Sequence, residues 1–274
     1  MALPLYQVDA FTDRLYAGNP AAVVPLESWL DAETMQAIGA ENNLSETAFL
    51  VPAENTDSEI TGCGDADADF EIRWFTPAAE ANLCGHATLA SAFVLFSQLG
   101  WDRDEIRFSS ASGGLAARRE ADGKITLDFP ARDGVPMPVP DGLEAAIGAP
   151  LVEFRRAVMN LAVLESEAAV RTVVPDLAYI HDLEGDGLVI TGPGEGCDCA
   201  SRYFAPHCGI DEDPVTGSAH CTIIPYWAAK LGKDSLHARQ VSARGGDLWC
   251  RLAGDRVLIS GYATLYMTGE ILEQ

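Results

Sequence analysis

Apolar residues follow two different spacings along this chain, and each spacing predicts a different kind of element. Short runs rich in β-branched residues predict strands, beginning with a hairpin formed by residues 5–11 and 19–24. A helical spacing after Asp31 predicts a helix to about residue 41, with Asp31 as its N-cap. The same patterns predict strands at residues 44–51, 70–75, 106–108, 114–118, 124–129, 152–163, 169–174, 187–191, 247–252, 256–259 and 263–268, a polar insertion at 53–69, and helices at 86–99, 141–148, 176–181 and 218–231.

Two stretches of the chain repeat one another. Each begins with Phe-x-Pro, continues through a polar loop to a glycine, Gly85 or Gly217, and then shows a helical pattern that closes with Leu-Gly. The closing glycine lies fifteen positions after the opening one in both copies, so His86 and Ser218 occupy matching places. A duplication of this kind predicts two similar half-domains with a ligand cleft between them.

The order of the predicted elements defines a fold class. Strands, one helix, more strands and one long helix follow each other twice, which predicts an α+β fold with two pseudo-symmetric half-domains. Each half is expected to be a rolled, mostly antiparallel sheet around a central helix. The expected division is residues 1–118 and 119–274, with the last ~12 residues returning to the first half. Because the chain has neither a Gly-x-Gly-x-x-Gly turn after a strand nor a Walker loop, we expect no nucleotide cofactor.

Composition and charge narrow the class of protein. With 48% hydrophobic and 22% charged residues, the 274-residue chain is expected to fold throughout. A net charge of −23 argues against nucleic acid and anionic membranes as partners, because a surface of this sign repels phosphates. Neither an export signal nor a membrane span is visible in the sequence, which predicts a cytoplasmic protein. Seven cysteines, an odd number, then favour reduced thiols over disulfides.

The two repeated helix starts are candidate anion sites. The first turn of a helix presents backbone N–H groups without intrahelical partners and the positive end of the helix dipole. Gly85 and Gly217 would let a substrate carboxylate approach this backbone closely, and the hydroxyl of Thr216 stands beside the second site. The alternative is that both glycines only form the turn into a helix.

Polar side chains around these starts are candidates for catalysis. Asp213 and Ser218 flank the start of the second helix, where such residues often act as caps, and capping and binding can coexist. His86 lies where the positive helix end would lower the imidazole pKa and favour the neutral ring. We therefore expect His86, Asp213 and Ser218 to orient the substrate or relay a proton.

Glu46 is the best candidate for a general acid and base. It stands at the mouth of an otherwise apolar strand pattern, where desolvation would raise the pKa of a carboxyl group toward the working pH. The alternative is a solvated carboxylate at the end of a strand.

Four motifs, together with the Gly-Asn-Pro turn at Asn19, carry a resemblance over almost the whole chain. They are Asn-Leu-Ser-Glu-Thr-Ala-Phe around Glu46, Phe-Thr-Pro, Cys-Gly-His-Ala-Thr around His86, and Asp-Pro-Val-Thr-Gly-Ser-Ala-His from Asp213. In the sequences and the order of these motifs, the chain resembles the PhzF-like, or phenazine biosynthesis-like, isomerase family. The resemblance implies a diaminopimelate-epimerase-like fold, a homodimer, and isomerase chemistry without a metal or another cofactor.

The resemblance also implies roles for individual residues. A glutamate that moves a proton within the substrate in the phenazine-pathway members matches Glu46, and neighbouring family residues match His86, Asp213 and Ser218. Gly85 and Gly217 match the backbone donors of a carboxylate site, and Asn19 is expected to line the cleft. The motif Cys-Gly-His-Ala-Thr differs from the corresponding sequence of the phenazine enzymes. The resemblance therefore implies a small carboxylate-bearing metabolite as the substrate, without specifying which one.

Three other interpretations start from the same sequence. Cys84 at a helix start suggests an epimerase that uses two cysteines, but the matching position in the second copy is Thr216. Cys197-x-Cys199 with scattered histidines is a weak zinc pattern, and structural or surface thiols are favoured over a metal site. The third interpretation is a metabolite-binding or scaffold protein that kept the fold without the chemistry.

Overall fold

The computed structural model describes residues 2–55 and 67–272, so residues 56–66 of the predicted polar insertion, with Cys63, lie outside the described residues. The chain forms two compact units. The first contains Met1–Asp128 and Ser260–Gln274, and the second contains Phe129–Ile259. Across the described ranges, none of the helices combines the length and the apolar character that crossing a membrane requires.

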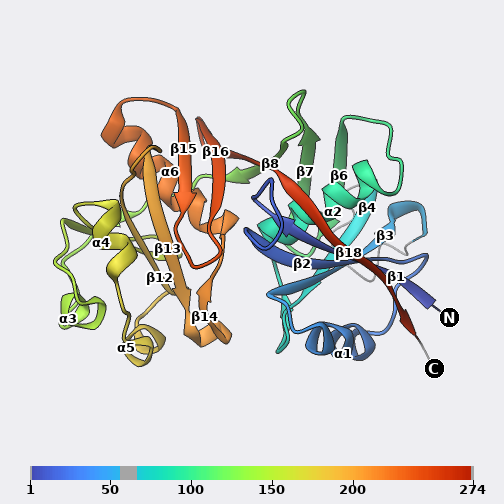
Figure 1. The fold of residues 1–274 in the computed structure, drawn as a ribbon, viewed down its shortest axis with the longest axis horizontal. Helices are drawn as coiled ribbons and strands as arrows, with labels where there is room; N and C mark the ends of the chain where they lie inside the picture. The colour runs from blue at the N-terminus through green and yellow to red at the C-terminus, as the bar shows by residue number, and fades with distance from the viewer. Residues whose placement is uncertain (1, 56–66, 273–274) are drawn as a thin grey trace. The chain divides into compact units, whose positions relative to one another are not determined.

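The first unit is a mixed sheet in which neighbouring strands are mostly antiparallel (Figure 1). β1 (Ala2–Ala10) lies between β2 (Asn19–Pro25) and β18 (Ala263–Leu272) and is antiparallel to both. The only parallel pairs recorded for this unit are β2 with β3 and β4 with β6, within the residues that the structure describes. The remaining strands are β3 (Glu46–Pro52), β4 (Phe70–Phe75), β5 (Glu80–Ala81), β6 (Glu105–Ser110), β7 (Gly113–Arg119) and β8 (Ile125–Pro130).

A buried helix forms the centre of the first unit. α2 (Gly85–Ser97) contacts β1, β2, β3, β7 and β18, and most of its side chains are inaccessible to solvent. Its apolar character on all sides is typical of a helix enclosed by other elements. α1 (Ala32–Asn42) instead contacts β3 and β4, and the Asp31 carboxylate caps it by accepting from the Thr34 N–H at 2.8 Å. The predicted cap and the predicted central helix are therefore confirmed.

The second unit repeats the strand pairing of the first. β10 (Glu153–Arg156) and β11 (Asn160–Val163) are antiparallel, and β11 and β12 (Leu188–Pro193) are parallel. β12 and β13 (Cys199–Ala205) are antiparallel, and β13 is parallel to β15 (Ser235–Gln240), which follows the helix α6 (Gly217–Leu231). The order of parallel and antiparallel pairs matches β1, β2, β3, β4 and β6 of the first unit. Its strands are β9 (Val135–Pro136), β10 (Glu153–Arg156), β11 (Asn160–Val163), β12 (Leu188–Pro193), β13 (Cys199–Ala205), β14 (Ile210–Asp213), β15 (Ser235–Gln240), β16 (Gly246–Ala253) and β17 (Arg256–Gly261).

This matching order confirms the α+β fold of two similar units. α6 is buried like α2 and ends at Gly232, as the repeat predicts. Each unit has an apolar core of its own, one around Phe49 and Phe75 and the other around Phe154 and Phe204. The second unit also contains the short helices α3 (Leu143–Ile147), α4 (Glu167–Thr172) and α5 (Leu177–Asp182), and single 3₁₀ turns lie at Ala53–Asn55 and Pro206–Cys208.

Two local predictions were wrong. Residues 152–163 form a hairpin of β10 and β11 instead of one strand, and the Ala157 N–H donates to the Met159 carbonyl in the turn. The strand predicted at 169–174 is largely the helix α4. Its N-cap is Ser166, whose hydroxyl accepts from the Ala169 N–H at 3.1 Å, and Arg171 pairs with Glu167 one turn earlier.

Candidate functional site

Three of the predicted site residues meet in the first unit. Asn19 is the first residue of β2, Glu46 the first residue of β3, and His86 the second residue of α2. Because β2 and β3 run parallel with Ala21 opposite Glu46, their starts lie at the same edge of the sheet. α2 contacts both strands, so its N-terminal turn brings His86 to this edge.

Three polar side chains lie close to the ring nitrogens of His86. Its Nε2 is 3.2 Å from Glu46 Oε2, and its Nδ1 is 3.1 Å from Asn19 Nδ2. Cys84, the N-cap of α2, places Sγ 3.4 Å from the same Nδ1. His86, Asn19 and Cys84 are buried, whereas the Glu46 side chain keeps 12% of its surface exposed. Of these groups, the carboxylate is thus the best placed to meet a ligand.

Burial determines the charge of this histidine. Desolvation lowers the pKa of His86 from 6.5 to about 3, so the ring is neutral near neutral pH. The direction agrees with the expectation from the helix terminus, but the cause is burial. Because the amide nitrogen of Asn19 faces Nδ1, that ring nitrogen accepts a hydrogen bond and the proton of the neutral ring sits on Nε2.

Backbone geometry before β2 holds Asn19 in place. Gly18 has a φ of +65°, and a Cβ added there would lie 2.1 Å from the Ala10 carbonyl oxygen. The buried carboxylate of Asp9 accepts from the Tyr16 N–H at 2.9 Å, which closes the loop between β1 and β2. Asn19 thus enters the site from a turn that only glycine fits.

The second unit holds its own buried network at the start of α6. The hydroxyl of Thr216, the N-cap of this helix, donates to the Asp213 carboxylate. Gln240 accepts from the Thr216 N–H at 2.8 Å and donates to the Asp213 carbonyl at 2.7 Å. Asp213 is therefore not the cap that its position suggested. Gly217 is buried as the first residue of α6, and Ser218 is half-buried in the first turn.

Sequence reasoning missed Gln240. It lies at the end of β15, whose Ser-Leu-His-Ala-Arg-Gln composition did not predict a strand. Its side chain is fully buried and makes three of the hydrogen bonds that orient Thr216 and Asp213. A polar residue at a strand end carries no recognisable signal for such a role, because its partners come from a distant part of the chain.

The helices α2 and α6 also make matching hydrogen bonds in their first turn. The Thr88 hydroxyl donates to the Cys84 carbonyl at 2.6 Å, and at the matching position His220 Nδ1 donates to the Thr216 carbonyl at 2.8 Å. His220 is fully buried, and desolvation lowers its pKa from 6.5 to about 4. Both buried histidines are therefore neutral at pH 7.

Acid is expected to destabilise the fold through these histidines. Their pKa values are about 3 for His86 and about 4 for His220 in the folded protein, against 6.5 in the unfolded chain. The contribution of these histidines to the free energy of unfolding is fully present above pH 6.5. It falls as the pH drops toward 4, because the unfolded chain then binds more protons than the folded protein. Each histidine contributes at most about 1.4 kcal/mol per pH unit over this interval.

Urea titrations at several pH values will check this expectation. His220→Gln should flatten the loss of unfolding free energy between pH 6.5 and 4 relative to the wild type. His181, whose side chain is 59% exposed, supplies the control substitution His181→Gln, which should leave the slope unchanged. Identical slopes for His220→Gln and the wild type would contradict the role assigned to burial.

The same cluster combines side-chain types that can ligate a metal ion. Among the described residues, Glu46, Cys84 and His86 are the group whose potential ligand atoms lie within 4.8 Å of one another. Glu46 Oε2 lies 3.2 Å from Nε2 and Cys84 Sγ lies 3.4 Å from Nδ1 of the same ring.

The remaining thiols have structural surroundings. The cysteines that the structure describes are free thiols, and burial raises the pKa of Cys199 and Cys250 and raises that of Cys221 to about 12. The half-buried Cys197 donates to the Cys199 carbonyl at 3.4 Å. These thiols lie in strands or helices of the second unit or beside them, in settings that suppress the reactive thiolate.

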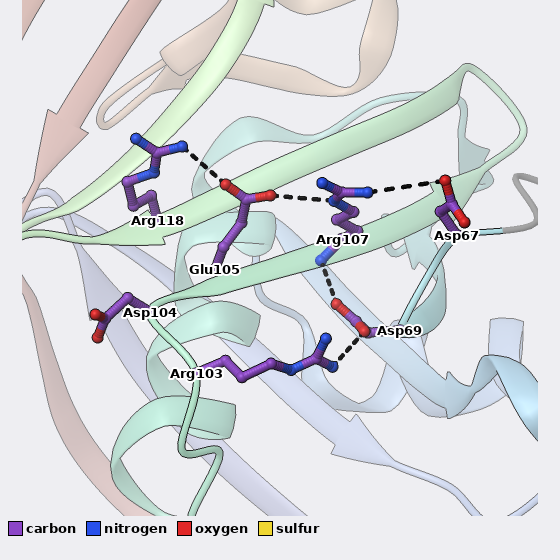
Figure 2. A pocket seen from close by; sticks show the side chains of 7 residues that line it. All are labelled: Asp67, Asp69, Arg103, Asp104, Glu105, Arg107 and Arg118. Atoms are coloured by element: carbon purple, nitrogen blue, oxygen red, sulfur yellow. Dashed lines mark hydrogen bonds and ion pairs between the residues drawn. The ribbon is translucent and has the colours of Figure 1, made fainter.

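A separate polar hollow in the first unit does not resemble a carboxylate site (Figure 2). It has a volume of about 600 Å³ and is lined by three arginines and four acidic residues. Glu105 pairs with Arg118 at 2.9 Å and with Arg107 at 3.1 Å, and Arg103 pairs with Asp69. Since each arginine is already matched to an acid of the hollow, an anionic substrate would have to displace an existing partner.

Comparison with known proteins places this site in a family context. Residues 8–269 match the sequence profile described as phenazine biosynthesis-like protein. A protein of Pseudomonas aeruginosa named as an uncharacterized isomerase is 49% identical over 272 residues, which cover 99% of both chains. A crystal structure of a PhzF-family phenazine biosynthesis protein from Enterococcus faecalis superimposes with a TM-score of 0.92 at 41% identity, and the match covers 100% of both chains.

A more distant structural likeness concerns the fold alone. A hydroxyproline epimerase from Agrobacterium vitis has a TM-score of 0.61 and 12% identity, covering 98% of this chain and 92% of the epimerase. The likeness confirms the expected epimerase-like architecture of two similar units.

Proposed function

Because this chain belongs to the phenazine biosynthesis-like family and is an isomerase, we propose that Glu46 moves a proton within a small carboxylate-bearing metabolite. The observation that carries this proposal is the contact of 3.2 Å between Glu46 Oε2 and the Nε2 of a neutral, buried His86. The Glu46 side chain is 12% exposed, so a substrate can approach it. General acid and base catalysis requires such a positioned group within reach of the transferred proton.

The chemistry proposed for Glu46 needs no cofactor. The carboxylate removes a proton from a carbon of the substrate, becomes a carboxylic acid, and returns the proton to a different atom. The neutral ring of His86 lies 3.2 Å from Oε2, and Asn19 holds this ring through the hydrogen bond to Nδ1. A catalytic group that is already held in a productive geometry lowers the entropic cost of reaching the transition state.

The start of α2 is the proposed place for the substrate carboxylate. Gly85 begins this helix directly beside His86, and the positive end of a helix dipole favours an anion there. Similar roles are proposed for Gly217 and Thr216 at the start of α6. Asp213 and Ser218 are proposed to orient substrate or relay a proton, and the hydrogen bonds of Asp213 to Thr216 and Gln240 support a fixed orientation of Asp213.

Solvent deuterium incorporation tests the proposal. The purified protein is incubated in D₂O with a panel of small carboxylates, including amino acids and cyclic unsaturated acids, and carbon-bound deuterium is measured by NMR and mass spectrometry. We expect deuterium at one carbon of a substrate on the panel, with equal rates before and after chelator treatment. Absence of exchange across a panel that includes a molecule shown by calorimetry to bind would favour a metabolite-binding protein.

Homodimerisation is a separate proposal, taken from the family resemblance. Light scattering coupled to size-exclusion chromatography should give about twice the 29.2 kDa mass of one chain. A mass of one chain over a range of concentrations would contradict it.

A further inference from the structure

We propose that Glu46, Cys84 and His86 form a binding site for zinc, and that the bound ion inhibits the protein. The three residues offer a carboxylate, a thiol and an imidazole, and one potential ligand atom of each lies within 4.8 Å of the others. Binding of the ion depends on these side chains alone. Its inhibitory effect rests on the function proposed for Glu46, because the ion would occupy the carboxylate that the reaction uses.

The imidazole of His86 supplies the observation that points to a ligand. The residue is 4% exposed, and its Nε2 is buried without a hydrogen-bond partner in the part of the chain that the structure describes. Glu46 Oε2 lies 3.2 Å from this nitrogen, yet no hydrogen bond joins the two atoms. Buried polar atoms almost always have a partner, which can be a water molecule or an ion. A cation bound to both Nε2 and Oε2 would be such a partner.

The spacing of the three side chains suits a tetrahedral zinc ion. Bond lengths of about 2.0 Å to nitrogen and oxygen and about 2.3 Å to sulfur place the ligand atoms roughly 3.3–3.8 Å apart. The distance of 3.2 Å between Nε2 and Oε2 is close to this range. Cys84 Sγ and a Glu46 oxygen lie within 4.8 Å of each other, so they need to approach by at most roughly 1.5 Å. Rotation about side-chain bonds can provide a shift of this size.

The ligand types favour zinc over the common hard cations. Thiolate and imidazole are typical zinc ligands, whereas magnesium and calcium take oxygen ligands. Cys84 is the N-cap of α2, where the positive end of the helix dipole favours a thiolate. Thiolate and carboxylate together balance the charge of Zn²⁺, so the buried complex is neutral.

The protons also balance when the ion binds. The S–H bond of Cys84 breaks as the Zn–S bond forms, and its proton leaves to solvent. The ring proton of His86 moves from Nε2 to Nδ1 as the Zn–N bond forms, so the ring stays neutral. A reversal of the Asn19 amide would then direct its oxygen toward Nδ1–H, which is the kind of contact that holds a ligating histidine in place.

The second unit does not repeat this set of ligands. Thr216 and Ser218 occupy the places of Cys84 and His86, and hydroxyl oxygens are not among the usual protein ligands of zinc. Across the described residues, the cluster in the first unit is the group of three whose potential ligand atoms lie this close together. We therefore expect one ion per chain.

Inhibition follows from the place that the ion would take. The Glu46 side chain is 12% exposed, whereas Cys84 is 5% exposed, so the ion would enter from the side of Glu46. Three protein ligands leave one tetrahedral position for water. A carboxylate that is bound to Zn²⁺ is a much weaker base, so proton removal from a substrate should stop.

Calorimetry with Zn²⁺ and absorbance with Co²⁺ test the site in the whole protein without any substrate. The chelator-treated protein should bind one Zn²⁺ per chain and no Mg²⁺. Co²⁺ takes the same types of ligand and should give the charge-transfer absorption of a cobalt–thiolate bond. Absence of zinc binding, or a cobalt complex without this absorption, would overturn the proposal.

Cys84→Ser is the decisive variant. Serine is a good N-cap and Cys84 makes no capping hydrogen bond with its side chain, so α2 should form as before, which urea denaturation will verify. Zinc binding should weaken by more than the roughly 10- to 100-fold that loss of a group hydrogen-bonded to a ligand costs, and the cobalt–thiolate absorption should disappear. Cys208→Ser changes an exposed thiol of the second unit and should bind zinc like the wild type. Equal zinc affinity of Cys84→Ser and the wild type would contradict the site.

Deuterium exchange separates this inference from the function proposed for Glu46. If a substrate is found, Zn²⁺ should lower its exchange rate with a midpoint equal to the dissociation constant from calorimetry. Cys84→Ser should need a much higher zinc concentration for the same relative effect. Unchanged exchange at saturating Zn²⁺ would overturn the inhibition and count against Glu46 as the base, while the measured binding would stand. If no carboxylate on the panel exchanges deuterium, the binding experiments still decide whether the site exists.

Discussion

Glu46→Gln is expected to lower the rate of deuterium exchange by about 100- to 10,000-fold, the usual contribution of a positioned acid or base. The amide has nearly the same shape as the carboxylate, but it cannot accept the substrate proton. Glu46 begins β3 and its side chain is partly exposed, so the substitution should cost little stability. Exchange rates measured at saturating substrate, together with binding by calorimetry, will show whether chemistry is lost while binding remains.

Glu105→Gln is the matched control for this experiment. It makes the same chemical change at the start of a strand of the first unit, in the ion-paired hollow of Figure 2. Its exchange rate should equal that of the wild type. A Glu46→Gln variant that retains wild-type exchange would exclude Glu46 as the base, and a loss confined to Glu105→Gln would move the site to the hollow.

Gly18→Ala is expected to reduce the free energy of unfolding by roughly 2–5 kcal/mol. A left-handed backbone costs an L-residue roughly 1–2 kcal/mol, and forcing an added methyl group into a packed region costs roughly 1–3 kcal/mol more. Both conditions hold here, because φ is +65° and the added Cβ would lie 2.1 Å from the Ala10 carbonyl oxygen. Urea denaturation at pH 7.5 measures the change.

Gly100→Ala separates the two causes. Gly100 has a φ of +73°, but no atom lies within 4 Å of a Cβ added there. This variant should therefore lose only the part that comes from backbone conformation. Equal losses in both variants would mean that the overlap with Ala10 is relieved at no cost. Where Gly18→Ala remains folded, a slower exchange rate is expected as well, because Gly18 precedes Asn19, which holds the ring of His86.

Local chemistry made many elements predictable. The N-cap Asp31 was visible because a cap needs only the residues of one helical turn. α4 was missed because its single apolar stripe is too short to show a period, even though Ser166 supplied a cap. β14 and β15 are rich in polar residues, and their strand conformation depends on pairing with β13 and β16.

The candidate site, too, was predictable from the sequence only in part. The sequence motifs identified Asn19, Glu46 and His86 separately, but they gave no information on the distances between these residues. Their contacts arise because β2 and β3 are parallel neighbours and α2 packs across both strands. Gln240 had no signal at all, since its role consists entirely of hydrogen bonds to residues of another segment.

The sequence by itself determined the duplication and the two repeated helices, and it supplied Glu46 as the candidate acid, because spacing and residue type are properties of the chain before it folds. Only the tertiary structure decided that His86 is neutral through burial, and that Asn19, Cys84 and Glu46 lie within 3.4 Å of its ring nitrogens. Desolvation and the direction of a side chain depend on what packs around it, and those neighbours come from distant parts of the chain.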